Sequence, residues 1–580
     1  MANLSQQRRE KMLAFLETLK EQHSDDDSLI AIGEIEKELK AKKYGLVWEE
    51  HEEAVDVQME TQIPVFTEVK EREICADECG AYNFLLEGDN LHSLYLLEKT
   101  HRGKIDVIYI DPPYNTGGKD FVYDDKYVNS EDSFRHSKWI SFMERRLRIA
   151  QKLLTNKGVI FISIDDNELY QLKMLCDDIL GAENFVANLI WAAGRKNDSK
   201  YISISHEYML CYAKSLSYLK EKKIVWKERK QGIEDIYKEA AKLKKKYGTD
   251  YYTMSAKLKE WYKYLPVNHP ARNHSHYNCI DEVGVYFPSD ISWPGGGGPK
   301  YEVLHPVTKK AVRVPNRGWV YPTKERMEEV IAQNLVHFGQ DETSVPCKKT
   351  YLFNNESSTP YSVFYKDGRA ATKRLRTLLG DSLFQNPKDE EIIANLLSFT
   401  SSKNSTILDF FAGSGTTGQA VMELNKQDGG HRKFILCTNN ENGICEEVTY
   451  QRLKTVITGK RADGSEYSEG IPANLKYFKT DFVDKDSEEL SDELLEHIAE
   501  MIELEHGIKI DNQKYVMILT DEEMDEFEKN IESFTDLKAV FVNQDILLSA
   551  TQQKLLDGLS SYVIPDYYFD FELREAGELW

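Results

Sequence analysis

Residues 105–114 read IDVIYIDPPY, an apolar, β-branched run that ends in the motif D-P-P-Y at 111–114. A second such run, TILD at 406–409, leads into FAGSGTT at 411–417. Short apolar runs bounded by Pro or Gly are typical of buried parallel strands. In an open α/β sheet, ligands bind at the carboxyl ends of such strands. The two motifs therefore predict the two sides of one binding cleft.

The pattern around both motifs alternates between strand and helix. We expect helices at about 90–97, 137–154, 168–180, 389–399 and 417–424, and strands at 159–164 and 434–437. Between these two blocks the alternation gives way to a Lys-rich helix, aromatic clusters and Pro/Gly loops. The sequence predicts a doubly wound, Rossmann-like α/β sheet that is interrupted by an inserted domain.

Changes in pattern divide the chain into five predicted regions. Residues 1–70 form a helical region, and 71–212 form the half of the sheet that carries D-P-P-Y. Residues 213–380 are the inserted domain, 381–480 the half with the glycine motif, and 481–580 an acidic α+β domain.

Composition limits the classes of protein to consider. The chain has 580 residues, of which 41% are hydrophobic, and this is enough for sizeable cores. No stretch approaches the roughly 18 apolar residues of a membrane span, and the N-terminus is polar, so we expect a cytoplasmic protein without a membrane partner. The eight cysteines form no C-x-x-C pair. Neither a disulfide framework nor a metal site is expected.

The charge is distributed unevenly. The net charge of −23 argues against a nucleic-acid partner, because DNA binding depends on Lys and Arg. However, residues 211–380 contain 30 Lys and Arg against 18 Asp and Glu, whereas residues 461–580 contain 10 against 30. A basic middle and an acidic tail indicate separate roles, and the basic part is suited to DNA.

The glycine motif alone leaves several cofactors open. Gly413, Gly415 and Gly418 spell G-x-G-x-x-G between a predicted strand and helix, which suits NAD, FAD or S-adenosylmethionine equally. In each case the backbone approaches the ligand closely and the helix N-terminus faces it. The D-P-P-Y motif distinguishes them, because dinucleotide enzymes have no use for it at a neighbouring strand end.

Together the two motifs resemble those of the amino-group DNA methyltransferases. In that family D-P-P-Y holds the target base and F-x-G-x-G holds S-adenosylmethionine. The catalytic motif comes first here, which is similar to the permuted β-class of adenine N6 methyltransferases. Segments such as HPVT at 305–308 and GW at 318–319 resemble the modification (Mod) subunits of type III restriction-modification systems.

The resemblance gives the D-P-P-Y residues Asp111, Pro112, Pro113 and Tyr114 catalytic roles. Adenine N6 is a poor nucleophile because its lone pair is delocalised into the ring. Acceptors from the Asp111 carboxylate and the Pro112 carbonyl would bind the amino hydrogens and free that lone pair. Tyr114 offers a face on which a base extruded from the duplex can stack. No metal is needed for this chemistry.

The resemblance also implies a set of cofactor-binding residues. They lie in the glycine motif and in shorter segments that resemble the family's. The chain departs from the family at one position, because the strand that ends at 437 lacks the acid that usually binds the ribose. Glu441 or an Asn would have to bind the ribose instead. The full set is Asp89, Phe384, Pro387, Lys388, Asp409, Phe411, Gly413, Gly415, Thr416 and Glu441.

Other segments similar to the family's are expected to support the site rather than act in it. Trp139 and Arg145 lie near a W-x-x-F-M-x-x-R pattern, and Asp165 and Glu168 in an I-D-D-N-E segment. His206 begins a segment that resembles one near the extruded base, and we interpret it as structural.

The resemblance implies that the insertion at 213–380 is a target-recognition domain for double-stranded DNA, with basic and aromatic residues interleaved. It also raises a homodimer and a restriction (helicase-nuclease) subunit as partners. The chain has no G-x-x-x-x-G-K-[ST] loop, so we expect any helicase to be a separate polypeptide. A solitary regulatory adenine methyltransferase remains an alternative. So does a cytosine N4 methyltransferase, although such enzymes more often have Ser in place of Asp111. From other classes, a nicotinamide or flavin enzyme and a non-catalytic DNA-binding subunit are less favoured.

Overall fold

The computed structural model describes residues 4–23, 25–40, 48, 51–77, 80–118, 121–123, 126–128, 131–192, 200–267, 269–381, 383–564 and 568–576. The chain forms two compact units. One contains Met1–Ile224 together with Tyr361–Trp580, and the other contains Val225–Pro360. The second unit is narrower than the insertion predicted at 213–380. Both ends of that range belong to the first unit, as α7 (Leu216–Glu221), β15 (Val363–Tyr365) and α11 (Arg369–Leu379).

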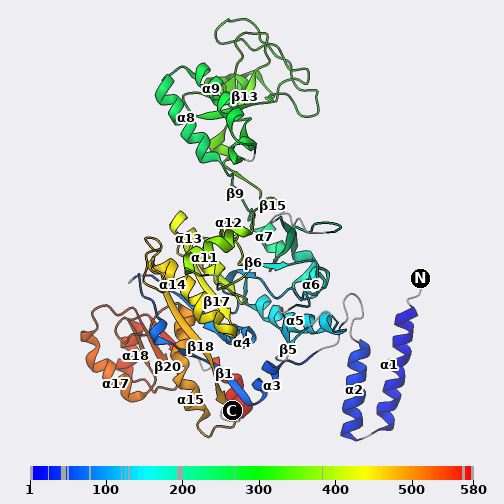
Figure 1. The fold of residues 1–580 in the computed structure, drawn as a ribbon, viewed down its shortest axis with the longest axis vertical. Helices are drawn as coiled ribbons and strands as arrows, with labels where there is room; N and C mark the ends of the chain where they lie inside the picture. The colour runs from blue at the N-terminus through cyan, green and yellow to red at the C-terminus, as the bar shows by residue number, and fades with distance from the viewer. Residues whose placement is uncertain are drawn as a thin grey trace. The chain divides into compact units, whose positions relative to one another are not determined.

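A ten-stranded sheet lies at the centre of the first unit (Figure 1). Every neighbouring pair from β18 to β6 is parallel, whereas β1 is antiparallel to β18, and β8 is antiparallel to both of its neighbours. In spatial order the strands are β1 (Gln62–Glu68), β18 (Asn474–Asp484), β2 (Tyr82–Glu87), β17 (Lys433–Thr438), β16 (Thr406–Asp409), β3 (Ile105–Ile110), β6 (Leu154–Ile164), β8 (His206–Ala213), β7 (Phe185–Ala192) and β15.

Helices cover the sheet in two groups, and Figure 1 shows them on opposite sides of the strands labelled β6 and β17. One group contains α4 (Asn90–His101), α5 (Arg135–Leu153) and α6 (Leu169–Cys176); the other contains α11, α12 (Glu390–Thr400), α13 (Thr416–Asp428) and α14 (Tyr450–Thr458). The helices pack because their apolar residues recur every three or four positions, as Trp139, Phe142, Met143 and Leu147 do in α5. The predicted doubly wound α/β sheet is confirmed.

The N-terminal region contains α1 (Leu4–Gln22), α2 (Asp26–Lys40) and α3 (Ala54–Thr61). The prediction of a helical region up to residue 70 is wrong for residues 62–68, which form β1 at the edge of the sheet. There Ile63, Val65 and Phe66 are buried, because the short apolar run pairs with β18 instead of continuing α3.

The second unit has its own core. Helices α8 (Ile233–Tyr247), α9 (Tyr251–Tyr264) and α10 (Lys324–Ala332) accompany an antiparallel sheet of β10 (Cys279–Ile280), β11 (Val285–Ser289), β13 (Cys347–Tyr351) and β12 (Val336–His337). A short antiparallel pair, β9 (Glu228–Arg229) and β14 (Ser357–Ser358), joins the two ends of this unit.

The acidic C-terminal region contains both helices and strands, as expected. After α15 (Leu490–Glu496) and α16 (Ile498–His506) come three parallel strands, β19 (Tyr515–Ile518), β20 (Ala539–Asn543) and β21 (Ser561–Ile564). They are connected by α17 (Asp521–Asn530) and α18 (Ala550–Asp557), and α19 (Asp570–Ala576) follows.

A small hairpin of β4 (Val122–Tyr123) and β5 (Lys126–Tyr127) lies between β3 and α5. None of the helices in the described ranges is both long enough and apolar enough to cross a bilayer.

Candidate active site

The D-P-P-Y and glycine motifs follow two strands that are neighbours in the sheet. β3 and β16 are parallel, and Val107 pairs with Ile407 and Ile108 with Leu408. The chain passes from β16 through α13 to β17 on one side, and from β3 through α5 to β6 on the other. The strand order therefore reverses between these two strands. This is the switch point at which doubly wound sheets bind ligands.

The D-P-P-Y segment is a loop held by its own side chains and by α5. The Tyr114 hydroxyl donates a hydrogen bond of 2.9 Å to Asp111 Oδ1. Pro112 is buried, and the carbonyl oxygen of Pro113 accepts a 2.7 Å hydrogen bond from Nε1 of the fully buried Trp139. These contacts fix the loop with the carboxylate and the aromatic ring on the same side as the glycine motif's strand end.

The residue after D-P-P-Y is held by a buried polar cluster. Asn115 has a left-handed backbone, with φ of 56°, and its Nδ2 donates 2.6 Å to Oε1 of Glu168. The same carboxyl oxygen lies 2.6 Å from Nδ1 of His136. Asn115 and Glu168 are both fully buried, and this burial raises the pKa of Glu168 to about 8. Glu168 thus holds the residue that follows the D-P-P-Y motif.

Lys388 and Glu207 contact the D-P-P-Y loop from other elements. Lys388 lies just before α12, and its Nζ donates to the Tyr114 hydroxyl at 2.5 Å, lies 3.3 Å from Asp111 Oδ1 and pairs with the Glu207 carboxylate. Glu207 comes from β8 and accepts a 3.2 Å hydrogen bond from the Tyr114 hydroxyl. The ammonium also lies 4.9 Å from the ring of Tyr114 and 5.7 Å from that of Trp191. In the structure Lys388 lies against Asp111 and Tyr114, and its assignment to the cofactor stays a prediction.

The charges in this cluster shift one another's titration. Burial raises the pKa of Asp111, and repulsion from Glu207 adds to this effect while Lys388 opposes it. Burial acts to lower the pKa of Lys388, but the two carboxylates outweigh it and raise the pKa above its usual value. Burial also raises the pKa of Tyr114. Lys388 therefore carries a charge that favours an ionised Asp111.

The glycine motif forms a turn that only glycine enters readily. Gly413 and Gly415 have φ of 50° and 75°, in the left-handed region that disfavours side chains. A Cβ on Gly413 would lie 3.6 Å from Cζ of Phe384, and one on Gly415 would lie 3.1 Å from Cγ2 of Thr449. The turn leads directly into Thr416, the first residue of α13. The structure thus brings Phe384 to the glycine motif, as the sequence predicted.

Two residues from the chain downstream of β17 brace this turn. The Thr449 hydroxyl donates to the carbonyl oxygen of Gly413. Arg452 is buried, and its guanidinium donates to the Ser414 hydroxyl at 3.0 Å and the Thr416 hydroxyl at 2.7 Å. Thr449 and Arg452 therefore fix the conformation of the glycine loop, and a ligand would contact the loop backbone on the face that these two residues do not occupy.

Asp409 and Phe411 flank the start of this loop. Asp409 is buried, and its carboxylate accepts hydrogen bonds from the Phe411 amide at 3.0 Å and the Thr417 hydroxyl at 2.5 Å. Burial raises its pKa to about 7. The ring of Phe411 packs against that of Phe142, with centroids 5.8 Å apart. These contacts hold Asp409 beneath the loop.

Asp89 caps the N-terminus of α4. It is followed by Asn90, whose side-chain amide donates to the carbonyl oxygen of Phe410 just before the glycine motif. The Asp89 carboxylate accepts from the Leu91 amide at 2.7 Å, as a helix cap, and lies 3.3 Å from a guanidinium nitrogen of Arg146. Arg146 also binds the side-chain oxygen of Asn90 and pairs with Glu53 at 2.8 Å. Asp89 thus caps α4, and its carboxylate is still partly exposed.

Glu441 and Pro387 complete the predicted set. Glu441 is exposed beyond the end of β17, whereas the side chain of Asn440 is turned inwards, and its Oδ1 accepts from the Cys445 and Glu446 amides. Pro387 is buried beside Lys388. The ribose contact assigned to Glu441 stays a prediction.

Sequence reasoning assigned no role to Asn115 or Arg452, and it named the segment that contains Glu207 without giving Glu207 a role. It also named Arg145, although the arginine that ends the W-x-x-F-M-x-x-R pattern is Arg146, which lies seven residues after the buried Trp139 and so shares the core face of α5. The neighbouring Arg145, which the sequence analysis named, is partly exposed and donates to the His51 carbonyl at 3.0 Å.

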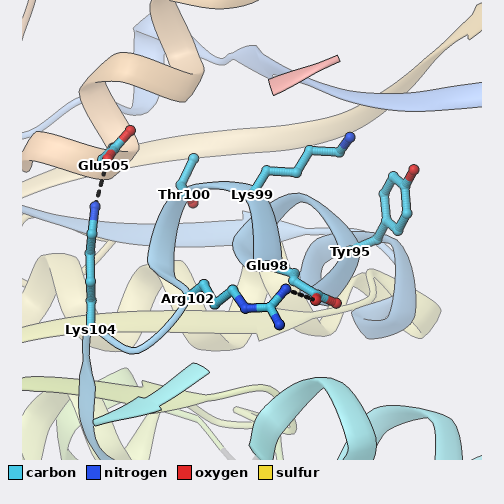
Figure 2. A pocket seen from close by; sticks show the side chains of 7 residues that line it. All are labelled: Tyr95, Glu98, Lys99, Thr100, Arg102, Lys104 and Glu505. Atoms are coloured by element: carbon cyan, nitrogen blue, oxygen red, sulfur yellow. Dashed lines mark hydrogen bonds and ion pairs between the residues drawn. The ribbon is translucent and has the colours of Figure 1, made fainter. Parts of the chain in front are cut away.

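A surface hollow lies away from these motifs (Figure 2). It has a volume of about 470 Å³ and is lined by α4, the following turn and Glu505 of α16. Its charges are paired, since Lys104 binds Glu505 and Arg102 binds Glu98. It shares no residue with the predicted site. Within the described ranges there is also no group of three His, Cys, Asp or Glu side chains placed to hold a metal ion.

Several curated proteins are similar in sequence. The StyLTI Mod subunit of Salmonella typhimurium, a type III restriction-modification enzyme, is 32% identical over 430 residues, which are 68% of this chain and 59% of the relative. The EcoP15I Mod subunit of Escherichia coli is 32% identical over 389 residues, 61% and 58% of the two chains. The type II methyltransferase M.KpnI of Klebsiella pneumoniae is 32% identical over 382 residues, 63% and 82% of the two chains. The chain thus spans about three fifths of the length of the type III Mod subunits it matches.

Solved structures give weaker matches. The cytosine-N4-specific PvuII DNA methyltransferase matches with a TM-score of 0.31 and 10% identity, over 64% of this chain and 86% of that one.

Residues 105–450, which begin with β3 and extend past the glycine motif into α14, match the N6_N4_Mtase family model, described as DNA methylase. With D-P-P-Y and the glycine loop at adjacent strand ends and this match over more than half of its length, the chain belongs to the DNA methylase family.

Proposed function

We propose that the protein is a site-specific DNA methyltransferase that transfers a methyl group from S-adenosylmethionine to the N6 amino group of adenine in duplex DNA. The observation that carries the proposal is the position of Asp111 and Gly413 at the ends of adjacent strands, β3 and β16. A donor bound at one loop and a base bound at the other would meet at the switch point.

The residues at the glycine loop fit this cofactor. Gly413 and Gly415 hold a tight turn whose backbone is bare, Phe384 lies against it, and Thr416 starts a helix whose N-terminus favours an anionic group such as a carboxylate. S-adenosylmethionine, when bound, supplies a methyl group on a positively charged sulfonium. The cofactor roles of Asp89, Pro387, Lys388, Asp409, Phe411 and Glu441 belong to this proposal.

The catalytic loop would act by holding the nucleophile. The Asp111 carboxylate and the Pro112 carbonyl accept the two amino hydrogens of the target, and this restores the lone pair on nitrogen. Tyr114 supplies an aromatic face for the extruded base. Asp111 is also the group placed to take the proton that the amino nitrogen loses. Trp139 and Glu168 keep the loop fixed, so no rearrangement is needed during the reaction.

The unit at 225–360 would recognise the target sequence. It carries the Lys-rich helix α8, and exposed aromatic side chains such as Tyr252 and Tyr264 on α9. Lys and Arg contact phosphates, whereas specificity needs side chains that reach base edges. Double-stranded DNA is the proposed partner, and action on cellular DNA would place the protein in the cytoplasm.

The type III Mod subunits among the relatives support a role as the modification subunit of such a system. In that case a restriction (helicase-nuclease) subunit and a second copy of the chain are the proposed protein partners. A methyltransferase that acts without a restriction subunit is the second candidate, since the chain covers 82% of the type II enzyme M.KpnI.

Incubation of the purified chain with unmethylated genomic DNA and S-adenosylmethionine, followed by long-read mapping of modified bases, tests the proposal. N6-methyladenine at one short sequence is expected, and methylation of only one strand of an asymmetric sequence would favour the type III role. N4-methylcytosine instead would change the assigned base. The absence of any modification, with or without a co-expressed restriction subunit, would contradict the proposal.

A further inference from the structure

The ammonium group of Lys388 occupies the acceptor that the target base would need. Its Nζ lies 3.3 Å from Asp111 Oδ1 and donates to the Tyr114 hydroxyl at 2.5 Å. It also lies over the Tyr114 ring, at 4.9 Å, and 5.7 Å from the ring of Trp191. Only 11% of the Lys388 side chain is exposed. The carboxylate and the aromatic face that methyl transfer assigns to an extruded base are thus already engaged by a side chain of the protein.

A protonated lysine and an exocyclic amino group compete directly. Both offer N–H donors to a carboxylate and both are attracted to the same aromatic ring, the ammonium through a cation–π contact. Asp111 Oδ1 already accepts from the Tyr114 hydroxyl and forms an ion pair with the Lys388 ammonium. A base that binds Asp111 Oδ1 and stacks on Tyr114 must displace Lys388 from both.

Glu207 gives Lys388 an anionic partner that does not belong to the catalytic loop. Its carboxylate comes from β8 and is 34% exposed, against 29% for Asp111. Lys388 can therefore give up its contact with Asp111 and still keep a charge-assisted hydrogen bond. The cost of leaving the ammonium buried without an anionic partner is avoided.

We propose, on the basis of the methyl transfer proposed above, that Lys388 is a displaceable stand-in for the target amino group and that Glu207 is the positioning residue that retains it. In the structure Lys388 pairs with both carboxylates and covers Tyr114. When the base is extruded, Lys388 gives up its contact with Asp111 and keeps the one with Glu207, and the freed acceptor binds the amino hydrogens. The balance between the two carboxylates sets how readily a base enters.

Base extrusion can be measured without methyl transfer. A duplex with 2-aminopurine next to the mapped target adenine becomes more fluorescent when that adenine leaves the stack, and the protein is added without S-adenosylmethionine. Lys388→Met removes the competing donor, so the extruded fraction should rise by about tenfold, the change expected for one charge-assisted hydrogen bond. Lys388→Arg restores the charge and should return the signal towards that of the unchanged protein.

Glu207→Gln should act in the opposite direction. It leaves Asp111 as the only anion beside the ammonium, so the extruded fraction should fall and the KM for duplex DNA should rise by about tenfold. On a duplex whose target adenine faces an abasic site, extrusion costs little, so the KM of Glu207→Gln should rise less there. In both duplexes its kcat should change far less than its KM. Lys403→Met is the matched control, because this exposed lysine donates to the Asp428 carbonyl, and it should change nothing.

The inference is overturned if Lys388→Met leaves the fluorescence unchanged, or if Lys388→Met and Glu207→Gln shift it in the same direction. Both outcomes are read on a protein that still methylates its target before mutation. An unchanged protein that modifies no adenine overturns the proposed function, and this inference with it.

Discussion

The side-chain amide of Asn90 donates a hydrogen bond of 2.8 Å to the carbonyl oxygen of Phe410, a residue 320 positions away. The oxygen of the same amide accepts from Arg146, which also binds Glu53 and Asp89. Since Phe410 precedes the glycine loop, these contacts connect three distant segments of the chain to the cofactor side of the site. Arg146, which is fully buried, is at the centre of this network.

Arg146→Met should destabilise the protein and weaken S-adenosylmethionine binding. Removing one partner from a buried ion pair typically lowers the free energy of unfolding by about 3–5 kcal/mol, because the Glu53 carboxylate stays buried without its partner. Chemical denaturation and calorimetric titration with S-adenosylmethionine measure the two effects. The neighbouring Arg145→Met is the control; it breaks a pair with Asp56 that is partly exposed, so about 1 kcal/mol or less is expected. Equal losses for the two variants would contradict the network.

Asp111→Ala should abolish methyl transfer and leave S-adenosylmethionine binding nearly intact. The carboxylate is the acceptor for the target amino group, and loss of a preorganised group of this kind typically costs about 100- to 1000-fold in kcat. Transfer of a labelled methyl group and calorimetric titration separate chemistry from binding. Asp367→Ala, at an exposed aspartate that pairs with Arg369, serves as the control. Loss of cofactor affinity in Asp111→Ala would show that the site is misassigned.

Gly415→Ala should weaken S-adenosylmethionine binding. Its φ of 75° disfavours a side chain, and the new Cβ would lie 3.1 Å from Thr449 Cγ2, so the loop must shift. Gly429→Ala is matched to it, because Gly429 also has a left-handed φ, of 66°, but a Cβ there would meet nothing within 4 Å. Both variants should lose about 1 kcal/mol of stability from backbone strain. Only the first should lose cofactor affinity in calorimetric titration, and equal affinities would argue against a cofactor at this loop.

The fold around the two motifs was predictable because each element carries a local signal. β3 and β16 are apolar runs that end in Pro-rich or Gly-rich turns, and α4 and α12 begin at Asp89 and Asp389, which cap them. The edge strand β1 was missed, since its seven residues follow a helix without a break and are buried only by pairing with β18.

The charged cluster at the site was not predictable to the same extent. Glu207 and Lys388 are 181 residues apart, and their meeting at Tyr114 depends on the positions of β8 and of the segment before α12 in the finished sheet. No periodicity encodes such a long-range pair. The resemblance to the family assigned Lys388 to cofactor binding. The contact with Asp111 neither requires nor excludes that role.

Replacing Lys242, Lys244, Lys245 and Lys246 with Gln should weaken DNA binding and flatten its salt dependence. These residues lie in the second half of α8, and each phosphate contact contributes about 0.9 to the slope of log K against log salt concentration. Filter binding or anisotropy between low and physiological salt measures this slope. Lys514→Gln with Lys529→Gln, in the acidic C-terminal region, is the control. An unchanged slope would show that α8 does not contact DNA.

Glu168→Gln should remove a pH dependence of stability. Burial raises the pKa of Glu168 from 4.5 to about 8, so between these values the folded protein keeps a proton that the unfolded chain has lost. The free energy of unfolding contributed by this group is therefore highest below pH 4.5 and falls as the pH rises to 8. The loss is on the order of 4–5 kcal/mol, because each unit of pKa difference corresponds to about 1.4 kcal/mol.

Gln is neutral at every pH and close to a protonated Glu in shape, so it can occupy the site beside Asn115 and His136 without this penalty. Denaturation at pH 5, 6.5 and 8 should show the variant gaining on the unchanged protein as the pH rises. Glu221→Gln, at an exposed residue paired with Lys222, should run parallel to the unchanged protein. If Glu168→Gln also ran parallel, Glu168 would be ionised in the fold, and the loop after Tyr114 would rest on a charged carboxylate instead of a neutral one.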